Sequence, residues 1–559
     1  MAVGTERHGG QILVDQLRLH GVDRAFCVPG ESFLAALDGL HGSGIDVVVA
    51  RHEGGAAMMA EADGKLTGRP GVLFVTRGPG ATNAASGLHV AMHDATPLVA
   101  FVGQIPRGFE GRGAFQEVDF PAFFGPLVKW AAEVRDTARL PEFVARAFAV
   151  ATSGRPGPVV LSLPEDMLSA RVTVADRPPA PPPPAPDHAA FADAALERLR
   201  AAARPLVVAG GPGWSQRAAD DLARLSAAAD LPVAVSFRRQ SYMDNRDPGY
   251  CGDLGVGMNP GLGAWLREAD AVLALGTRLS ETATAGYTLL DPAQPQPQLI
   301  HVYPQAEEIG RVYTPGLSCA APAPQVLSAL ARRAAEAPAT TDRRAAARAL
   351  YEAWQRPQET PGALKLEAVV AHLSQALPED AIVTNGAGNY AAWLHRYFRF
   401  KRWGTQLAPT SGSMGYGLPA AIAAKLRHPA RPVICLAGDG CLQMTVTELS
   451  TAAQYGAGVI VLVVNNGRYG TIRMHQERTY PGRVAATDLV LPDIPALARA
   501  YRGVGETVTE TDRFPAALAR ALETGGLRLI ELVTDGEALS PVQTLRQARA
   551  AGEAALSRS

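Results

Sequence analysis

Short apolar runs alternate with longer amphipathic stretches along the whole chain. Runs such as residues 47–50 (VVVA), 71–75 (GVLFV) and 97–102 (PLVAFV) are each followed by polar or glycine residues. Continuous apolar runs of this length are typical of strands that are buried on both faces of a parallel sheet. Further runs of this kind are residues 205–209, 232–236, 271–275, 381–385, 432–438 and 459–466.

Segments of helix length lie between these runs, as the crossovers between parallel strands require. Residues 54–66, 218–229 and 445–455 are examples that mix apolar and polar positions. The same alternation recurs in three parts of the chain. It predicts an α/β protein with three doubly wound parallel sheets.

Two seams divide these parts. The run RPPAPPPPAPD at residues 177–187 holds seven prolines, which lack a backbone donor and favour an extended spacer. A second, weaker seam is the Ala- and Arg-rich stretch of residues 332–356, which is either a pair of surface helices or a connector. We therefore expect domains at residues 1–175, 187–335 and 360–559.

The composition excludes several classes of partner. The chain has 559 residues, 53 Lys and Arg against 54 Asp and Glu, and 47% hydrophobic residues, which is ample material for several packed cores. The near-neutral charge without a basic block excludes the electrostatic footprint of a protein that binds nucleic acid or an anionic membrane. No run reaches the roughly 18 apolar residues of a membrane span, and the first thirty residues do not resemble a signal peptide.

The five cysteines are scattered and form no CxxC pair, so they indicate neither a disulfide framework nor a zinc site. Together with the absence of a signal peptide pattern, this predicts a cytoplasmic protein.

Ligands of open α/β sheets bind beyond the carboxyl ends of the strands, so the residues after the apolar runs carry the chemistry. Asp439 follows one such run within Gly438-Asp439-Gly440, and Asn465-Asn466 end the next run. Oxygen-bearing side chains of this kind suit Mg²⁺, and the glycines let a phosphate approach the backbone. A single GDG is often only a turn, but the pairing with Asn-Asn favours a metal and phosphate site.

The segment from this GDG to Asn466 resembles the thiamine diphosphate (ThDP) signature, and its sequence is similar to the acetolactate synthase type of that family. By this resemblance Asp439 and Asn466 bind Mg²⁺ through their side chains, and Arg468 through its carbonyl. The residues of this segment that the resemblance assigns to the cofactor are Gly438, Asp439, Gly440, Cys441, Asn466 and Arg468. Thr445 and Glu448 are placed to open or brace the following helix.

Two further loops resemble the family. The loop TNGAGNYAAW, residues 384–393, implies that Gly388 and Asn389 contact the diphosphate, although an ordinary turn remains the alternative. The segment PTSGSMGYGL, residues 409–418, matches the place where a bulky apolar side chain bends the cofactor. The resemblance assigns this role to Met414, and it assigns to the carbonyl of Gly412 the hydrogen bond from the cofactor amine.

Glu53 follows the apolar run at 47–50 in the sequence Arg51-His52-Glu53, in the position of the family's activating glutamate. By resemblance its carboxyl group binds the aminopyrimidine ring and favours removal of the cofactor's acidic proton. Without the distant GDG motif, Glu53 would be interpreted as an acid at a helix N-terminus. In the family the glutamate and the metal ligands come from different subunits, which implies a homodimer or homotetramer with active sites at the subunit interface.

The residues that face the substrate are less constrained. The segment GRGAFQEVD resembles the AFQE loop of acetolactate synthases, which implies that Phe115 and Gln116 line the cleft. Glu165 stands where those synthases usually have a Lys, which removes a cation from the neighbourhood of the bound 2-oxo acid. Glu31 occupies the place of a catalytic Asp in pyruvate-decarboxylase-like enzymes, or it caps the following helix. Arg473 and His475 follow the metal loop and are either substrate contacts or surface residues.

The central part carries GGPGW and GTRLSE at predicted strand ends, but a lone GxG is a weak nucleotide signal. The sequence around Arg238 and Arg239 differs from the FAD-holding synthases, so we expect no FAD, while nucleotide binding stays open. The resemblance implies a ThDP- and Mg²⁺-dependent enzyme that decarboxylates a small 2-oxo acid and ligates the product to a second carbonyl. The alternatives are a simple decarboxylase that releases an aldehyde, and a catalytically silent ThDP-binding protein.

Overall fold

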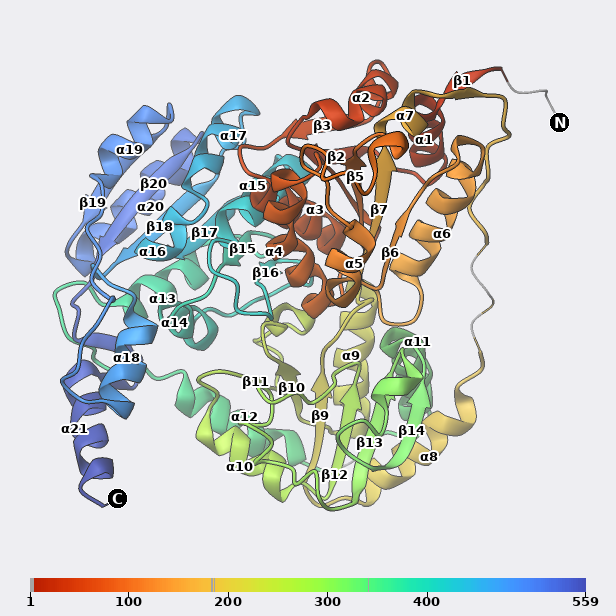
Figure 1. Cartoon of the computed structure of the whole chain (residues 1–559). Helices are drawn as coiled ribbons and strands as arrows, with labels where there is room; N and C mark the ends of the chain where they lie inside the picture. The colour runs from red at the N-terminus through yellow and green to blue at the C-terminus, as the bar shows by residue number, and fades with distance from the viewer. Residues whose placement is uncertain (1–4, 182–183, 185, 340, 559) are drawn as a thin grey trace. The chain divides into compact units, whose positions relative to one another are not determined.

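Three six-stranded parallel sheets organise the chain (Figure 1). In the computed structural model, residues 5–181, 184, 186–339 and 341–558 are described. By their internal contacts these residues form two units. Unit 1 comprises Met1–Pro184, Leu418–His428 and Thr445–Ala457, and unit 2 comprises Ala185–Gly417, Pro429–Met444 and Gly458–Ser559. The prediction of three doubly wound α/β sheets is confirmed.

Unit 1 is built on a sheet with the strand order β3-β2-β4-β5-β7-β6, in which all neighbours are parallel. Its strands are β2 (Arg24–Cys27), β3 (Asp46–Val49), β4 (Gly71–Val75), β5 (Leu98–Gln104), β6 (Trp130–Glu133) and β7 (Pro158–Pro164). β1 (Arg7–His8) and β8 (Arg171–Val172) form a separate antiparallel pair.

The helices of unit 1 lie on the two faces of this sheet, as the crossovers require. They are α1 (Gly9–Leu19), α2 (Leu34–Leu40), α3 (Glu53–Thr67), α4 (Pro79–Asp94), α5 (Phe120–Phe124), α6 (Leu140–Thr152) and α7 (Glu165–Ser169). Most of α15 (Gly417–Arg427) and all of α17 (Leu449–Gln454) also belong to unit 1, although they lie far along the chain. Arg427 of α15 binds Asp23 and Asp63 in salt bridges of 3.0 and 2.8 Å.

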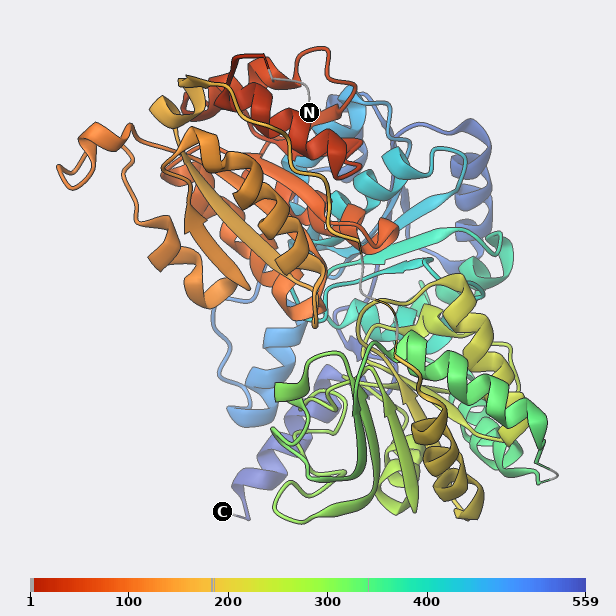
Figure 2. The same ribbon diagram turned by 90° about the vertical axis from the view of Figure 1, so that its right-hand side faces the viewer.

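The first sheet of unit 2 has the order β11-β10-β9-β12-β13-β14 and is also parallel throughout. Its strands are β9 (Pro205–Ala209), β10 (Val233–Ser236), β11 (Tyr250–Leu254), β12 (Ala271–Leu275), β13 (Gln296–Tyr303) and β14 (Pro315–Ala320). One core joins the sheet to α8 (Ala189–Ala201), α9 (Gln216–Ala229) and α11 (Ala323–Glu336). The core of the opposite face contains α10 (Pro260–Glu268) and α12 (Arg343–Trp354). Figure 2 gives a second view of the ribbon, turned by 90°.

The second sheet of unit 2 has the order β16-β15-β17-β18-β20-β19. Its strands are β15 (Ile382–Asn385), β16 (Gln406–Leu407), β17 (Val433–Gly438), β18 (Ile460–Asn465), β19 (Val504–Val508) and β20 (Arg528–Val533). Its helices are α13 (Leu366–Ala376), α14 (Tyr390–Tyr397), α16 (Asp439–Gln443), α18 (Gly470–Thr479), α19 (Ile494–Ala500), α20 (Phe514–Thr524) and α21 (Leu545–Leu556). β21 (Ala538–Ser540) and β22 (Gln543–Thr544) form a small hairpin.

The structure describes the two predicted seams, residues 177–187 and 332–356, to different extents. Residues 177–181 of the proline-rich run adopt neither helix nor strand, and Pro182, Pro183 and Ala185 lie outside the described residues. The Ala- and Arg-rich seam includes the end of α11 and all of α12, so its helix-pair alternative is the one observed. The domain boundaries themselves stay a prediction. Among the described residues, no helix has the length and apolarity that a bilayer crossing would need.

Candidate active site

The GDG and Asn-Asn motifs meet at the carboxyl edge of the second sheet of unit 2. β17 ends at Gly438 and β18 ends at Asn465, and the two strands pair directly, with Gly438 opposite Val464. The carboxylate of Asp439 then joins the two loops. Its Oδ2 accepts hydrogen bonds from the backbone N–H groups of Asn466 and Gly467 at 3.2 and 2.8 Å. The parallel register therefore brings together the two motifs that the sequence separates.

Asp439 is buried, with 4% of its surface exposed. Burial raises the pKa of this carboxyl group, while the backbone N–H groups that it binds act in the opposite direction. Its Oδ1 accepts from the N–H of Gly440 at 2.7 Å, so three donors occupy a group that offers about four acceptor positions. A carboxylate in this state can still bind a cation, and a cation would offset the cost of burying its charge.

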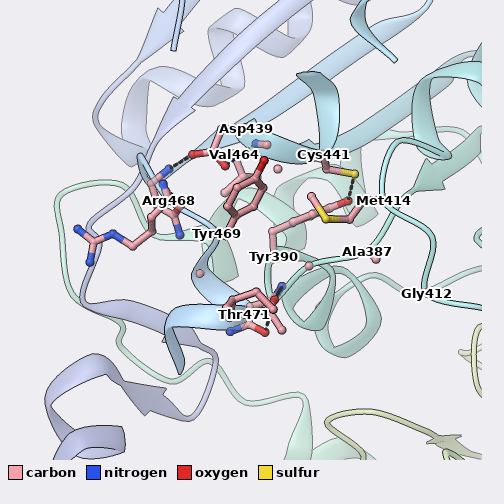
Figure 3. A pocket seen from close by; sticks show the side chains of 17 residues that line it. Ala387, Tyr390, Gly412, Met414, Asp439, Cys441, Val464, Arg468, Tyr469 and Thr471 are labelled. Carbon is pink, nitrogen blue, oxygen red and sulfur yellow. Dashed lines mark hydrogen bonds between the residues drawn. The ribbon is translucent and has the colours of Figure 1, made fainter. Parts of the chain in front are cut away.

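A cavity of about 240 Å³ opens beside these motifs (Figure 3). Five glycines line it, together with polar side chains from both motifs and apolar side chains. All ten residues that the sequence assigns to the cofactor in this part of the chain line this glycine-lined cavity. They are Gly388, Asn389, Gly412, Met414, Gly438, Asp439, Gly440, Cys441, Asn466 and Arg468.

Glycine is required at the cavity wall for physical reasons. Gly412 has a φ of +68° and Gly388 a φ of +151°, which are conformations that other residues rarely adopt. A Cβ at Gly440 would lie 2.6 Å from the ring of Tyr469. The side chain of Met414 packs against the apolar core of this sheet, so it is held at the cavity rather than exposed. The wall is thus a backbone surface that a ligand can approach closely.

Seven of the seventeen lining residues were not identified from the sequence, and three of them, Tyr390, Tyr469 and Thr471, bring hydroxyl groups to the cavity. Tyr390 donates its hydroxyl hydrogen to the Sγ of Cys441 at 3.3 Å and accepts from the N–H of Gly386 at 3.1 Å. Thr471 donates to the Oδ1 of Asn389 at 2.9 Å. Figure 3 draws the hydrogen bond between Tyr390 and Cys441 and that of Thr471 as dashed lines. The position of Tyr390 directly after Asn389 was the available signal.

Glu53 belongs to unit 1, where it is the first residue of α3. It is 9% exposed, and the Nδ2 of Asn83 donates to its Oε2 at 3.0 Å. A Cβ at Gly80 would lie 3.3 Å from Oε1, so this glycine leaves space beside the carboxylate. His52 caps α3 by accepting from the N–H of Gly54 through Nδ1. The position of Glu53 is therefore fixed by the start of α3 and its His52 cap, and its carboxylate is oriented by the amide of Asn83.

Glu448 holds the loop that precedes Glu53. Its Oε1 accepts from the backbone N–H groups of Arg51 and His52 at 3.2 and 3.0 Å, and Thr451 donates to its Oε2 at 2.6 Å. Glu448 is the N-cap residue of α17, and its side chain binds the helix through Thr451 rather than through a backbone N–H group. The segment expected as one helix at 445–455 is instead a 3₁₀ turn, η7 (Val446–Glu448), followed by the short α17. Burial raises the pKa of Glu448.

Glu31 and Gln116 lie at the carboxyl edge of the sheet of unit 1. Glu31 begins the 3₁₀ helix η1 (Glu31–Phe33), and its side chain is 61% exposed. Gln116 has a φ of +64°, and its Oε1 is buried without a hydrogen-bond partner among the described residues. Phe115 beside it is 76% exposed. The functional roles of Glu31 and Gln116 stay predictions.

Arg473 and His475 lie on α18 and are not among the residues that line the cavity. The Nε of Arg473 donates to the Oε1 of Glu477 at 3.0 Å, and Arg549 binds the same carboxylate. His475 is exposed. In this structure Arg473 belongs to an ion-pair network of α18 and α21, and a substrate role for either residue stays a prediction.

Family models match the three parts of the chain in order. The thiamine pyrophosphate enzyme N-terminal TPP binding domain matches residues 7–123, and the central domain of the same enzymes matches residues 192–330. The C-terminal TPP binding domain matches residues 386–532 and thus includes both motifs of the cavity.

Whole-chain relatives agree with these matches. The acetolactate synthase large subunit of Parasynechococcus marenigrum is 34% identical over 96% of this chain and 89% of its own length. The acetolactate synthase isozyme 3 large subunit of Escherichia coli is 32% identical over 96% of both chains. The mitochondrial acetolactate synthase catalytic subunit of Aspergillus candidus is 31% identical over 94% of this chain and 80% of its own length. The chain therefore belongs to the thiamine diphosphate-dependent enzymes, and within them it is acetolactate synthase-like.

Proposed function

We propose that this protein catalyses decarboxylation of a 2-oxo acid coupled to carbon–carbon ligation, with ThDP and Mg²⁺ as cofactors. The observation that carries the proposal is the single cavity around which the ten cofactor residues predicted in this part of the chain converge. The names of the relatives support ligation over simple decarboxylation as the leading reaction.

The donor set at the cavity fits a hydrated Mg²⁺ ion. Asp439 offers a carboxylate with remaining acceptor capacity, and Asn466 and Arg468 offer an amide and a carbonyl oxygen. These are hard oxygen ligands, which Mg²⁺ prefers and combines with phosphate oxygens. In this proposal Asp439, Asn466 and Arg468 hold the metal, and the glycines of the wall admit the diphosphate.

When bound, ThDP supplies a nucleophilic carbon and a sink for the electron pair that a 2-oxo acid releases with CO₂. Gly388 and Asn389 would contact the diphosphate, and the interaction of Asn389 with Thr471 fixes that loop. Met414 would support the pyrimidine end of the cofactor, and the carbonyl of Gly412 would accept a hydrogen bond from its amine. Glu53 would form a hydrogen bond to the pyrimidine ring, in an orientation that the hydrogen bond from Asn83 sets.

The assembly and the compartment are part of the same proposal. We expect a homodimer or homotetramer in which Glu53 of one subunit serves the cavity of another, and we expect the protein in the cytoplasm. Two relatives are named large subunits, so the proposal includes a second, smaller partner subunit as an alternative assembly. That the protein binds no FAD, and that its domains span residues 1–175, 187–335 and 360–559, also stay predictions.

Simple decarboxylation is the second candidate, because one observation favours it. The side chain of Glu31 is 61% exposed. It follows β2, at the same edge of the unit 1 sheet at which Glu53 follows β3. A carboxyl group in that position can donate a proton to a carbanion, which would release an aldehyde instead of a ligated product.

A panel of 2-oxo acids tests the proposal, with CO₂ release measured and products identified by mass spectrometry. A ligated product supports it, whereas free aldehyde alone supports simple decarboxylation. Glu53→Gln should reduce kcat at least 100-fold and leave the Kd for ThDP within about tenfold. Glu142→Gln is the matched control, because Glu142 also lies in the first turn of a helix of unit 1 but is exposed. Undiminished turnover in Glu53→Gln would defeat the proposed activation.

A further inference from the structure

Three charged side chains meet at the carboxyl edge of the sheet of unit 1. Glu31 follows β2, Arg77 follows β4 and Glu165 follows β7. The Nη1 of Arg77 donates to the Oε2 of Glu165 at 2.8 Å, and its Nη2 lies 3.6 Å from the Oε1 of Glu31. The three strands belong to one parallel sheet, so their carboxyl ends bring these residues to the same edge.

The cation of this cluster is buried, while its acidic partners reach solvent. Arg77 is 8% exposed, whereas the side chains of Glu31 and Glu165 are 61% and 35% exposed. An arginine side chain stays charged in proteins, and burying a charge is costly unless partners satisfy it. The Nε of Arg77 is buried and has no hydrogen-bond partner among the described residues. The fold therefore leaves donor capacity on this guanidinium.

The helix that begins just after Arg77 lies beside Glu53. In α4 the Nδ2 of Asn83 donates to the Oε2 of Glu53 at 3.0 Å, and a Cβ at Gly80 would lie 3.3 Å from the Oε1 of Glu53. Arg77 therefore lies in the short connection between β4 and the helix that contacts the proposed activating group.

Gln116 approaches the same loop from the other side. A Cβ at Gly78 would lie only 2.7 Å from the Cβ of Gln116. Glu117 holds the Gln116 loop by accepting from the N–H groups of Gly111 and Ala114 at 2.6 and 2.8 Å. The Oε1 of Gln116 has no partner among the residues that the structure describes. The buried Nε of Arg77 and the buried Oε1 of Gln116, a residue that is itself only partly buried, therefore lie close to Gly78 with unused hydrogen-bonding capacity.

We propose that Arg77 binds the carboxylate of the 2-oxo acid substrate. This inference rests on the proposed function and names the residue that recognises the acid group. The planar guanidinium matches a carboxylate in geometry and charge. Glu165 holds it through Nη1, and the substrate replaces the long, solvent-screened contact with Glu31. Glu165 and Glu31 add negative charge beside Arg77. The attraction for the substrate carboxylate therefore comes from the guanidinium itself and not from the net charge of the cluster.

Steady-state kinetics of the holoenzyme with pyruvate as the probe test this assignment. Arg77→Gln should raise KM at least 30-fold and leave kcat within about fivefold. Arg77→Lys, which keeps the charge but loses the planar fork, should raise KM about 5- to 10-fold. Glu31→Gln should lower KM about two- to threefold, because it removes a competitor for the guanidinium.

Arg107→Gln is the matched control. Arg107 pairs with Asp166 at 2.9 Å, next to Glu165 in the chain, but it is more exposed than Arg77. Its KM for pyruvate should stay within twofold of the wild type. An unchanged KM in Arg77→Gln, or in Arg77→Lys where the first variant fails to fold, would overturn the assignment. A wild type that releases no CO₂ from any 2-oxo acid would instead overturn the proposed function and this inference with it.

Discussion

Substituting Glu448 by Ala should loosen the loop that carries Glu53 before it affects any other part of the active site. Glu448 is 0% exposed and is the acceptor for the backbone N–H groups of Arg51 and His52. Removing it leaves two partly buried donors without their partner, and a buried donor in that state costs about 1–3 kcal/mol. We therefore expect the loop to open more easily by about 2 kcal/mol, which corresponds to roughly 30-fold.

Amide hydrogen exchange of residues 49–56 in the cofactor-free protein measures this opening directly. Exchange at Arg51 and His52 should accelerate about 30-fold in Glu448→Ala, and kcat should fall 10- to 100-fold because Glu53 is less often in position. Glu448→Gln keeps an acceptor oxygen and should show a much smaller effect. Ser450→Ala is the control, because it removes only the contact of Ser450 with the Arg51 side chain. Unchanged exchange in Glu448→Ala would refute the argument.

Three further predictions concern unit 2. Gly412→Ala places a Cβ at a φ of +68° in the cavity wall and should weaken ThDP binding at least tenfold in a fluorescence titration, whereas Gly404→Ala, at a φ of +72° outside the lining, should not. Asp439→Asn should raise at least 100-fold the Mg²⁺ concentration that half-saturates ThDP binding, as measured by titration at fixed cofactor. Hydrogen bonds from Arg549 lower the pKa of Glu477 from 4.5 to about 2, so its stabilisation is complete above pH 4.5 and is lost as the pH falls toward 2. Between pH 7 and pH 4 the loss is about 1 kcal/mol, and Glu477→Gln should show a correspondingly smaller decrease of Tm.

The nine apolar runs singled out in the sequence all form strands of the three parallel sheets. Such strands are buried on both faces, so the runs are nearly uninterrupted, as in β4 with the sequence GVLFV. Strands with polar or small residues were not recognised. β6, with the sequence WAAE, is only partly buried, and the edge strand β16 has two residues. The match between apolar runs and buried strands is not complete, because the edge strand β3 was recognised although it is only partly buried, and the fully buried interior strand β7 was not singled out.

The residues of the glycine-lined cavity were predictable for a different reason. Gly438, Asp439 and Asn466 lie at the ends of strong apolar runs, where the backbone geometry of the strand end restricts the residue type. Thr471 and Tyr469 line the same cavity, but they follow the strand end within a loop and a helix start that carry no pattern. The role of Glu448 was missed because its partners, Arg51 and His52, are nearly 400 residues away in the sequence.

The cavity of unit 2 and the charged cluster of unit 1 respond differently to sequence change. At the glycine-lined cavity, Gly440 cannot gain even a Cβ without meeting Tyr469, and Asp439 already binds three backbone donors. Few substitutions keep that geometry. The GDG and Asn-Asn motifs are therefore recognisable in the sequence, and they indicate the family of the cofactor. Arg77 and Glu165 instead make contacts between side chains at loop positions, where the sign of a charge can change without moving a strand. Membership of the family therefore indicates the coenzyme, while the acid that the enzyme accepts depends, in our proposal, on the charged cluster of unit 1.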